Sequence, residues 1–176
     1  LERWMKIHNL KEASKTLNYL TEHGITEYDV LSERAETIAA DFEAVSTSIK
    51  QMEHRMEQIA ALKTHIINYA KTRDTYVAYR KTKAADKPAF HTAHEADLLL
   101  HEAAKRAFDA QGVKKLPTVK VLQTEYADLL TKKKAAYEDY KRLRKENQEL
   151  QAVKSNVDTL LRIEEEHQEK KQEQNR

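Results

Sequence analysis

The stretch that decides the fold is IAADFEAVSTSIKQMEHRMEQI, residues 38–59. Its apolar side chains recur at alternating intervals of four and three residues, which is the heptad pattern of a coiled coil. The positions are Ile38, Phe42, Val45, Ile49, Met52, Met56 and Ile59. A second series with the same alternation runs from Leu122 through Leu129 and Leu143 to Leu150. The two series predict two long helices that each bury one narrow apolar stripe.

The composition points the same way. Charged residues make up 34% of the 176 residues, and the chain has only two glycines and two prolines. So few turn-forming residues allow few chain reversals, which suits long helices better than a sheet. We therefore expect an all-α fold. The absence of cysteine excludes disulfides, thiolate zinc sites and cysteine nucleophiles, and it agrees with a reducing cytoplasm.

The four breakers divide the chain into helical segments. We expect a long antiparallel coiled-coil hairpin with an N-terminal packing helix and a small helical cap at its tip. The predicted segments are the N-terminal helix over 1–24, the hairpin over 25–166 with long helices at about 32–82 and 118–166, the helical tip over 83–117, and a polar, disordered tail over 167–176. An intermolecular coiled coil fits the same pattern, so both arrangements stay open.

Local signals mark the ends of these segments. In the N-terminal helix, Leu10, Leu17 and Leu20 are expected to share the packing face, and Gly24 is suited to the left-handed residue after its last turn. Pro88 suits the first turn of the next helix, and Thr118 is the expected N-cap of the second long helix.

The stretch FHTAHEADLLLHEAAKRAF, residues 90–108, brings three histidines together. On one helix, at ~100° per residue, His91, His94 and His101 fall on the same side. The spacing does not match H-E-x-x-H, and His101 would lie ~10 Å along the axis from His94, too far for one helix to close three ligands. We therefore interpret the stretch as a packing helix, with no metal site and no cofactor.

No catalytic constellation is evident. Glycine-rich phosphate loops are absent, and no sequence resembles a nucleophile elbow. Most of the eight tyrosines stand at or near heptad spacing, so packing explains them better than nucleophilic chemistry. We expect no catalytic residue and no enzymatic activity from this chain.

The remaining candidate function rests on charge. Residues 63–120 contain 12 Lys or Arg against 6 Asp or Glu, an excess of +6, interleaved with tyrosines. Such a mixture can neutralise phosphates and stack bases, which predicts DNA binding. The candidate DNA-binding residues are Lys71, Arg73, Arg80, Lys81, Lys83, Lys87, Lys114 and Lys115. Lys114 and Lys115 are expected to return to the same end of the hairpin. A solvated coiled-coil face is the alternative explanation.

No apolar run approaches the ~18 residues of a membrane span, so we expect no membrane insertion. The chain begins LERW without a methionine, and we expect it to be part of a longer protein.

Several short elements, in this order and spacing, resemble the C-terminal helical region of relaxases, the mobilisation nucleases of conjugative and mobilisable elements in Gram-positive bacteria. They are NLK (9–11), NYL with a following glycine (18–24), YAKTRD (69–74), AHEADLLLHEAAKRAFD (93–109), GVKKLP (112–117) and EYADL (125–129). The similarity covers about residues 4 to 163.

The resemblance implies a non-catalytic region in the bacterial cytoplasm that serves conjugative DNA transfer. In that family a separate N-terminal domain nicks DNA with a tyrosine and a histidine-bound metal, so no catalytic residue is carried over to this chain. The implied partners are transfer-origin DNA and relaxosome or coupling proteins. The coiled-coil pattern separately allows a homodimer. A coiled-coil dimerisation or interaction module without DNA contact is the alternative.

Overall fold

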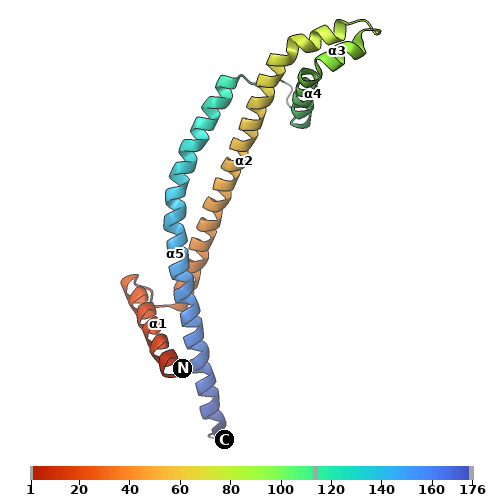
Figure 1. Ribbon diagram of the computed structural model, residues 1–176. Coiled ribbons are helices and arrows are strands. Elements are labelled where there is room, and N and C mark those ends of the chain that lie inside the picture. The colour runs from red at the N-terminus through yellow and green to blue at the C-terminus, as the bar shows by residue number, and fades with distance from the viewer. Residues whose placement is uncertain (1, 113–114, 175–176) are drawn as a thin grey trace. The chain divides into compact units, whose positions relative to one another are not determined.

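The computed structural model describes residues 2–112 and 115–174 of the chain. These residues form α-helices and no strand, so the expected all-α class is confirmed (Figure 1). The helices are α1 (Glu2–Glu22), α2 (Tyr28–Lys81), α3 (Lys87–Ala93), α4 (Glu95–Ala110) and α5 (Val119–Gln174). None of these helices combines the length and the apolar character needed to cross a membrane.

The chain divides into two compact units, each containing a stretch of α2 and a stretch of α5. Unit 1 comprises Leu1–Ser48 and Ala136–Arg176, and unit 2 comprises Ile49–Ala135. In unit 1 the Gln151 side chain donates to the Ala35 carbonyl at 3.3 Å, and in unit 2 Lys133 pairs with Glu53 at 2.7 Å.

Other pairs show the direction of packing. Phe42 meets Tyr140 in unit 1, and Arg55 meets Glu125 in unit 2. In unit 1, Ala35 of α2 contacts Gln151 of α5, and Phe42, which comes later in α2, contacts Tyr140, which comes earlier in α5. The two helices are therefore antiparallel there, and the ion pairs of unit 2 join the middle of α2 to an early part of α5.

The apolar core of unit 1 joins the start of α2 to the middle of α5. Its buried members are Ile25, Leu31, Ala35, Leu150 and Val153. The N-terminal helix packs against this core through Tyr19 and Leu20. The face predicted for it is wrong in part, because Leu10 and Leu17 are 71% and 64% exposed.

The face of α1 that is buried instead includes Thr16, which is 3% exposed. The Asn156 amide of α5 donates to the Thr16 hydroxyl at 3.0 Å. This hydrogen bond satisfies polar groups that would otherwise be costly to bury. The buried face of α1 therefore includes a polar contact that the spacing of its leucines does not predict.

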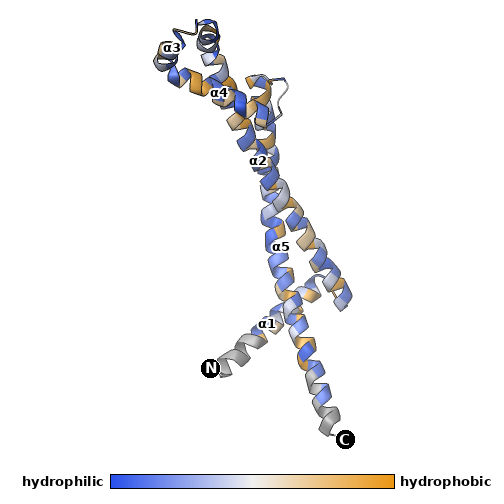
Figure 2. Cartoon of the chain, turned by 90° about the vertical axis from the view of Figure 1, so that its right-hand side faces the viewer, coloured by the Kyte–Doolittle hydropathy of each residue, from blue (hydrophilic) through white to orange (hydrophobic). Residues whose placement is uncertain are grey.

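The core of unit 2 brings three helices together. Ile59 and Leu62 of α2, Ala104 and Phe108 of α4, and Leu122 of α5 form one buried cluster. Figure 2 shows apolar and polar residues mixed along both long helices, as expected for narrow packing stripes. Of the predicted α2 series, Ile49, Met56 and Ile59 are buried and the other members are half-buried.

The local signals match the structure at three positions. Gly24 follows α1 with φ of +62°, the left-handed region that favours glycine. Pro88 lies in the first turn of α3. The Thr118 hydroxyl accepts a hydrogen bond from the Val121 amide at 3.3 Å, which caps the first turn of α5.

Two boundaries differ from the prediction. The histidine stretch is not one helix, because His94, with φ −127° and ψ 26°, separates α3 from α4. The helix α5 also continues to Gln174 instead of ending near residue 166 in a disordered tail. Glutamate, lysine and glutamine are strong helix formers, so the helix can continue without apolar residues.

Candidate nucleic-acid interface

The predicted DNA-binding residues are distributed over three parts of unit 2. Lys71, Arg73, Arg80 and Lys81 lie on the last turns of α2, Lys83 lies in the connection to α3, and Lys87 begins α3. Lys115 lies between α4 and α5. Lys114 was also predicted, and it lies outside the described residues.

Four of these cations form what we call the α2 basic surface: Arg73, Arg80, Lys81 and Lys83. All four are exposed. Arg73 and Arg80 are seven residues apart and therefore share one side of α2, about 10 Å apart along the axis. Lys71 is also exposed but projects from nearly the opposite side, since it lies ~160–180° around the helix from both arginines.

The charges of the α2 basic surface are not neutralised locally. Among the residues that the structure describes, none of the four forms an ion pair. Elsewhere the pattern is different, because Lys141 pairs with Glu138 and Arg142 pairs with Asp139. Lys141 and Arg142 of α5 therefore have ion-pair partners, which the four cations lack among the described residues.

One carboxylate lies within this segment. Asp74 is the single acidic residue between positions 63 and 81, and it is exposed. At ~100° per residue it points within ~20° of the direction of Lys81, so it lowers the positive potential of the same surface.

Lys87 is held differently from the other cations. It is half-buried, and its ammonium lies 5.5 Å from the centre of the Tyr79 ring. A cation over an aromatic face at this distance is attracted by the ring without losing its charge. Phe90 and His91 of α3 contact the same tyrosine, with ring centres 6.2 and 6.0 Å away. Tyr79 therefore anchors α3 and positions Lys87.

Lys115 lies in the connection between α4 and α5, and its gathering with the other cations stays a prediction. Phe108 and Leu122, seven residues before and after it, belong to the same buried cluster as Ile59 and Leu62. Leu62 precedes Arg80 by 18 residues on the same helix, which corresponds to about 27 Å. Lys115 is therefore joined on both sides to helices that contribute to this cluster, and we do not count it in the α2 basic surface.

The tyrosines of the basic segment are occupied in packing. The His101 ring lies between Tyr69 and Tyr76, stacked on both, with ring centres 4.5 and 4.2 Å apart. Phe108 meets the edge of Tyr69, and the Lys105 ammonium lies 5.3 Å from the centre of the Tyr76 ring. These two rings fix α4 onto α2 and are not exposed platforms for bases.

His101 is the most buried histidine of the described chain, at 1% exposure. The Thr72 hydroxyl donates to the Asn68 carbonyl at 2.7 Å, so its one proton is used. His101 Nδ1 lies 3.0 Å from the same oxygen and must therefore carry the proton that it donates. Burial lowers the pKa of His101, and the neighbouring Lys105 lowers it further, while Glu102 opposes the effect. The neutral form is favoured.

The other histidines of the stretch do not join His101. His91 and His94 are exposed, and His94 packs against Phe90 with ring centres 4.4 Å apart. No group of three or more His, Asp or Glu side chains in the described residues is arranged to hold a metal ion. The sequence showed three histidines on one face, but the break at His94 gives them different surroundings.

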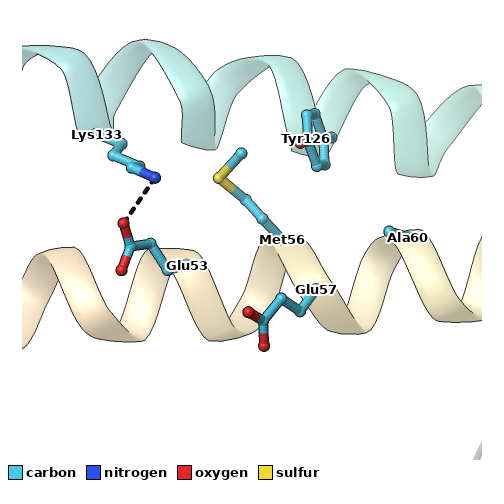
Figure 3. A pocket seen from close by; sticks show the side chains of 6 residues that line it. All are labelled: Glu53, Met56, Glu57, Ala60, Tyr126 and Lys133. Atoms are coloured by element: carbon cyan, nitrogen blue, oxygen red, sulfur yellow. Dashed lines mark ion pairs between the residues drawn. The ribbon is translucent and has the colours of Figure 1, made fainter.

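A pocket lies between α2 and α5 in unit 2, with a volume of about 330 Å³. Figure 3 shows Lys133 reaching from α5 to Glu53 of α2, with the Met56 side chain beside the pair and Glu57 directed away from α5. The Lys133 ammonium lies 2.7 Å from the Glu53 carboxylate. The lining thus combines an apolar side chain with a pair of charges that neutralise each other.

Comparisons with protein-family models, with curated proteins and with solved structures find no match to this chain.

Proposed function

We propose that the chain is a non-catalytic DNA-contacting region of a conjugative relaxase, and that it binds nucleic-acid phosphates through the α2 basic surface. The observation that carries the DNA-binding part is the exposure of Arg73, Arg80 and Lys81 without a described ion-pair partner. Unpaired surface cations release condensed counterions from DNA when they bind phosphates, which favours association. The connection to conjugative transfer rests on the sequence resemblance.

The paired cations of α5 supply the contrast that supports this assignment. A solvated helix face commonly carries Lys and Arg together with Glu and Asp at spacings of three or four residues. Lys141 and Arg142 follow that pattern, and Arg80 and Lys81 do not. The local excess of positive charge is therefore available to an external anion.

The test is fluorescence anisotropy with a labelled DNA duplex across a salt series. The variant R80E/K81E changes one Arg and one adjacent Lys, and the matched control K141E/R142E makes the same charge change on α5. We expect the first pair to weaken binding and to reduce the slope of log K against log salt by about 1.8, or 0.9 per lost phosphate contact. The control should retain the slope.

A gain of affinity provides a second test that misfolding cannot imitate. The change Asp74→Asn removes the carboxylate on α2 that points most nearly in the direction of Lys81. The variant should therefore bind DNA more tightly than the wild type, by a larger factor at low salt than at high salt. If R80E/K81E and K141E/R142E weaken binding equally, the α2 basic surface is not the contact, and the proposal fails.

A second candidate function is supported by the outer side of α4. Leu99 and Leu100 are 52% and 43% exposed, although the other side of the helix is buried against α2. Adjacent exposed leucines on a docked helix favour an interaction with another protein or a second copy. Light scattering over a concentration series tests self-association: a constant mass near 20.5 kDa would exclude a homodimer in that range.

A further inference from the structure

The structure also bears on which form of DNA the chain binds, an inference that rests on the proposed function. We infer that the α2 basic surface binds the phosphates of duplex DNA in preference to a single strand. Three observations lead to this assignment: the tyrosine rings are occupied, the cations are spaced along the axis of α2, and the described part of α2 has no exposed aromatic side chain beside them.

The tyrosine rings near the α2 basic surface are already in contact with other side chains. Proteins that bind single strands combine cations with aromatic platforms on which successive bases stack. Here Tyr69 and Tyr76 each stack one face on His101, and Lys105 lies over the Tyr76 ring. Tyr79 is contacted by α3 and by Lys87. A single strand would leave its bases without partners, whereas the bases of a duplex already stack within the double helix.

The positions of these rings on α2 support the same conclusion. Thr72, Tyr76 and Tyr79 fall within about 60° of one another around the helix, on the side that faces α3 and α4. Arg73 and Arg80 lie at the edge of that side, and Lys81 lies beyond it. The side of α2 that carries the basic surface therefore has cations without interleaved aromatic rings, contrary to the pattern that the linear sequence suggested.

The length of the surface matches the charge density of a duplex. Arg73 and Lys81 are eight residues apart, which is about 12 Å along α2. A duplex carries one phosphate per ~1.7 Å of its axis, so about seven phosphates occupy that length, against three or four for one of its strands. The duplex therefore presents about twice as many phosphates as one strand to Arg73, Arg80 and Lys81, and Lys83 follows just beyond this length.

These considerations give different salt dependences for the two forms. With four phosphate contacts, the slope of log K against log salt is expected to be about −3.6 for a duplex and about −2.8 for a single strand. Between 50 and 200 mM salt, the affinity for the duplex should then fall roughly 150-fold. Because the slope for the duplex is steeper, the preference for the duplex should be larger at 50 mM than at 200 mM salt.

The experiment compares a labelled 20-nucleotide single strand, chosen to lack self-complementarity, with the same strand annealed to its complement. Anisotropy is measured with the wild-type chain, R80E/K81E and the control K141E/R142E. Tighter binding of the duplex, lost in R80E/K81E and kept in the control, is the expected result. Circular dichroism of each variant verifies that its helical content is unchanged.

The outcomes separate this inference from the proposed function. Equal or tighter binding of the single strand, still sensitive to R80E/K81E, would overturn the duplex preference and leave the DNA-binding function standing. No binding of either form at 50 mM salt would overturn both. Duplex binding that R80E/K81E does not change would place the contact elsewhere and also overturn the inference.

Discussion

The change His101→Ala tests how α4 is held against α2. The histidine ring is almost completely buried and stacks on two tyrosines, so its removal leaves a cavity between Tyr69 and Tyr76. Removing a buried aromatic ring typically costs about 3–5 kcal/mol, and the smaller imidazole belongs at the low end. We therefore expect a loss of about 3 kcal/mol in the free energy that holds α4 in place.

Native-state hydrogen exchange of the α4 amides measures this free energy where it acts. A loss of about 3 kcal/mol corresponds to an increase of roughly 150-fold in the population that exposes those amides. The exposed His91 is the matched control, because its ring contacts Tyr79 from α3 and not from α4, so His91→Ala should change the exchange of the α4 amides little.

A second variant separates ring packing from hydrogen bonding. The change His101→Phe keeps a flat ring between the tyrosines but loses the hydrogen bond to Thr72, whose own donor remains bonded to Asn68. We expect this variant to stay within about 1.5 kcal/mol of the wild type. If His101→Ala accelerated α4 exchange no more than His91→Ala does, the histidine would not anchor α4, and the packing argument would be refuted.

Three further predictions concern one buried histidine, one ion pair and one hydrogen bond to a carboxyl group. Because burial lowers the pKa of the His101 imidazole, the unfolded chain binds a proton there more readily than the folded chain does. The free energy of unfolding that depends on His101 should therefore be constant above about pH 6.5 and decrease below it. Urea midpoints across this pH range measure the dependence, which His101→Phe should reduce. Arg55 and Glu125 form two hydrogen bonds, at 2.7 and 3.1 Å, but both are partly exposed, so a double-mutant cycle should give a coupling of about 0.5 kcal/mol. The Tyr28 hydroxyl donates to Asp158 at 2.6 Å and lowers the pKa of that carboxyl, so Tyr28→Phe should raise this pKa in a carboxyl-carbon NMR titration.

The heptad pattern was sufficient to predict the long helices. In α2, Ile49, Met56 and Ile59 are buried where the alternation placed them, and in α5 Leu122, Leu143 and Leu150 are buried as well. This success has a simple cause: a helix with one narrow apolar stripe must bury that stripe, whatever its partner is. Lys133, four residues after Leu129 and therefore at the next heptad position of α5, is accommodated by its ion pair with Glu53.

The break at His94 could not be predicted, because it has neither glycine nor proline beside it. Local preferences favour continuing the helix from Pro88 through residue 110. The structure instead turns at His94, and α4 places Leu98, His101 and Ala104 against neighbouring helices. Tertiary packing thus outweighed the local preference, and spacing along one segment contains no information about such a partner.

The candidate interface was predictable in composition but not in arrangement. The charge excess between residues 63 and 120 is visible in the sequence. The role of Tyr69 and Tyr76 is not, because their partner His101 lies 32 and 25 residues further along the chain. The same is true of Lys115, whose separation from Arg80 depends on where α5 meets α2.

The contacts of unit 1 and unit 2 join residues that lie at different distances along the sequence, and this difference has a consequence for the order of folding. In unit 2, the hydrogen bond from Thr75 to Asp97 closes a loop of 22 residues, whereas in unit 1 the bond from Tyr28 to Asp158 closes one of 130 residues. Closing the longer loop from the unfolded chain costs about 1.6 kcal/mol more in chain entropy. Contacts that are close in sequence also form sooner. We expect α4 to dock on α2 early and unit 1 to assemble last, so pulse-labelled amides of α4 should gain protection before those near Leu31.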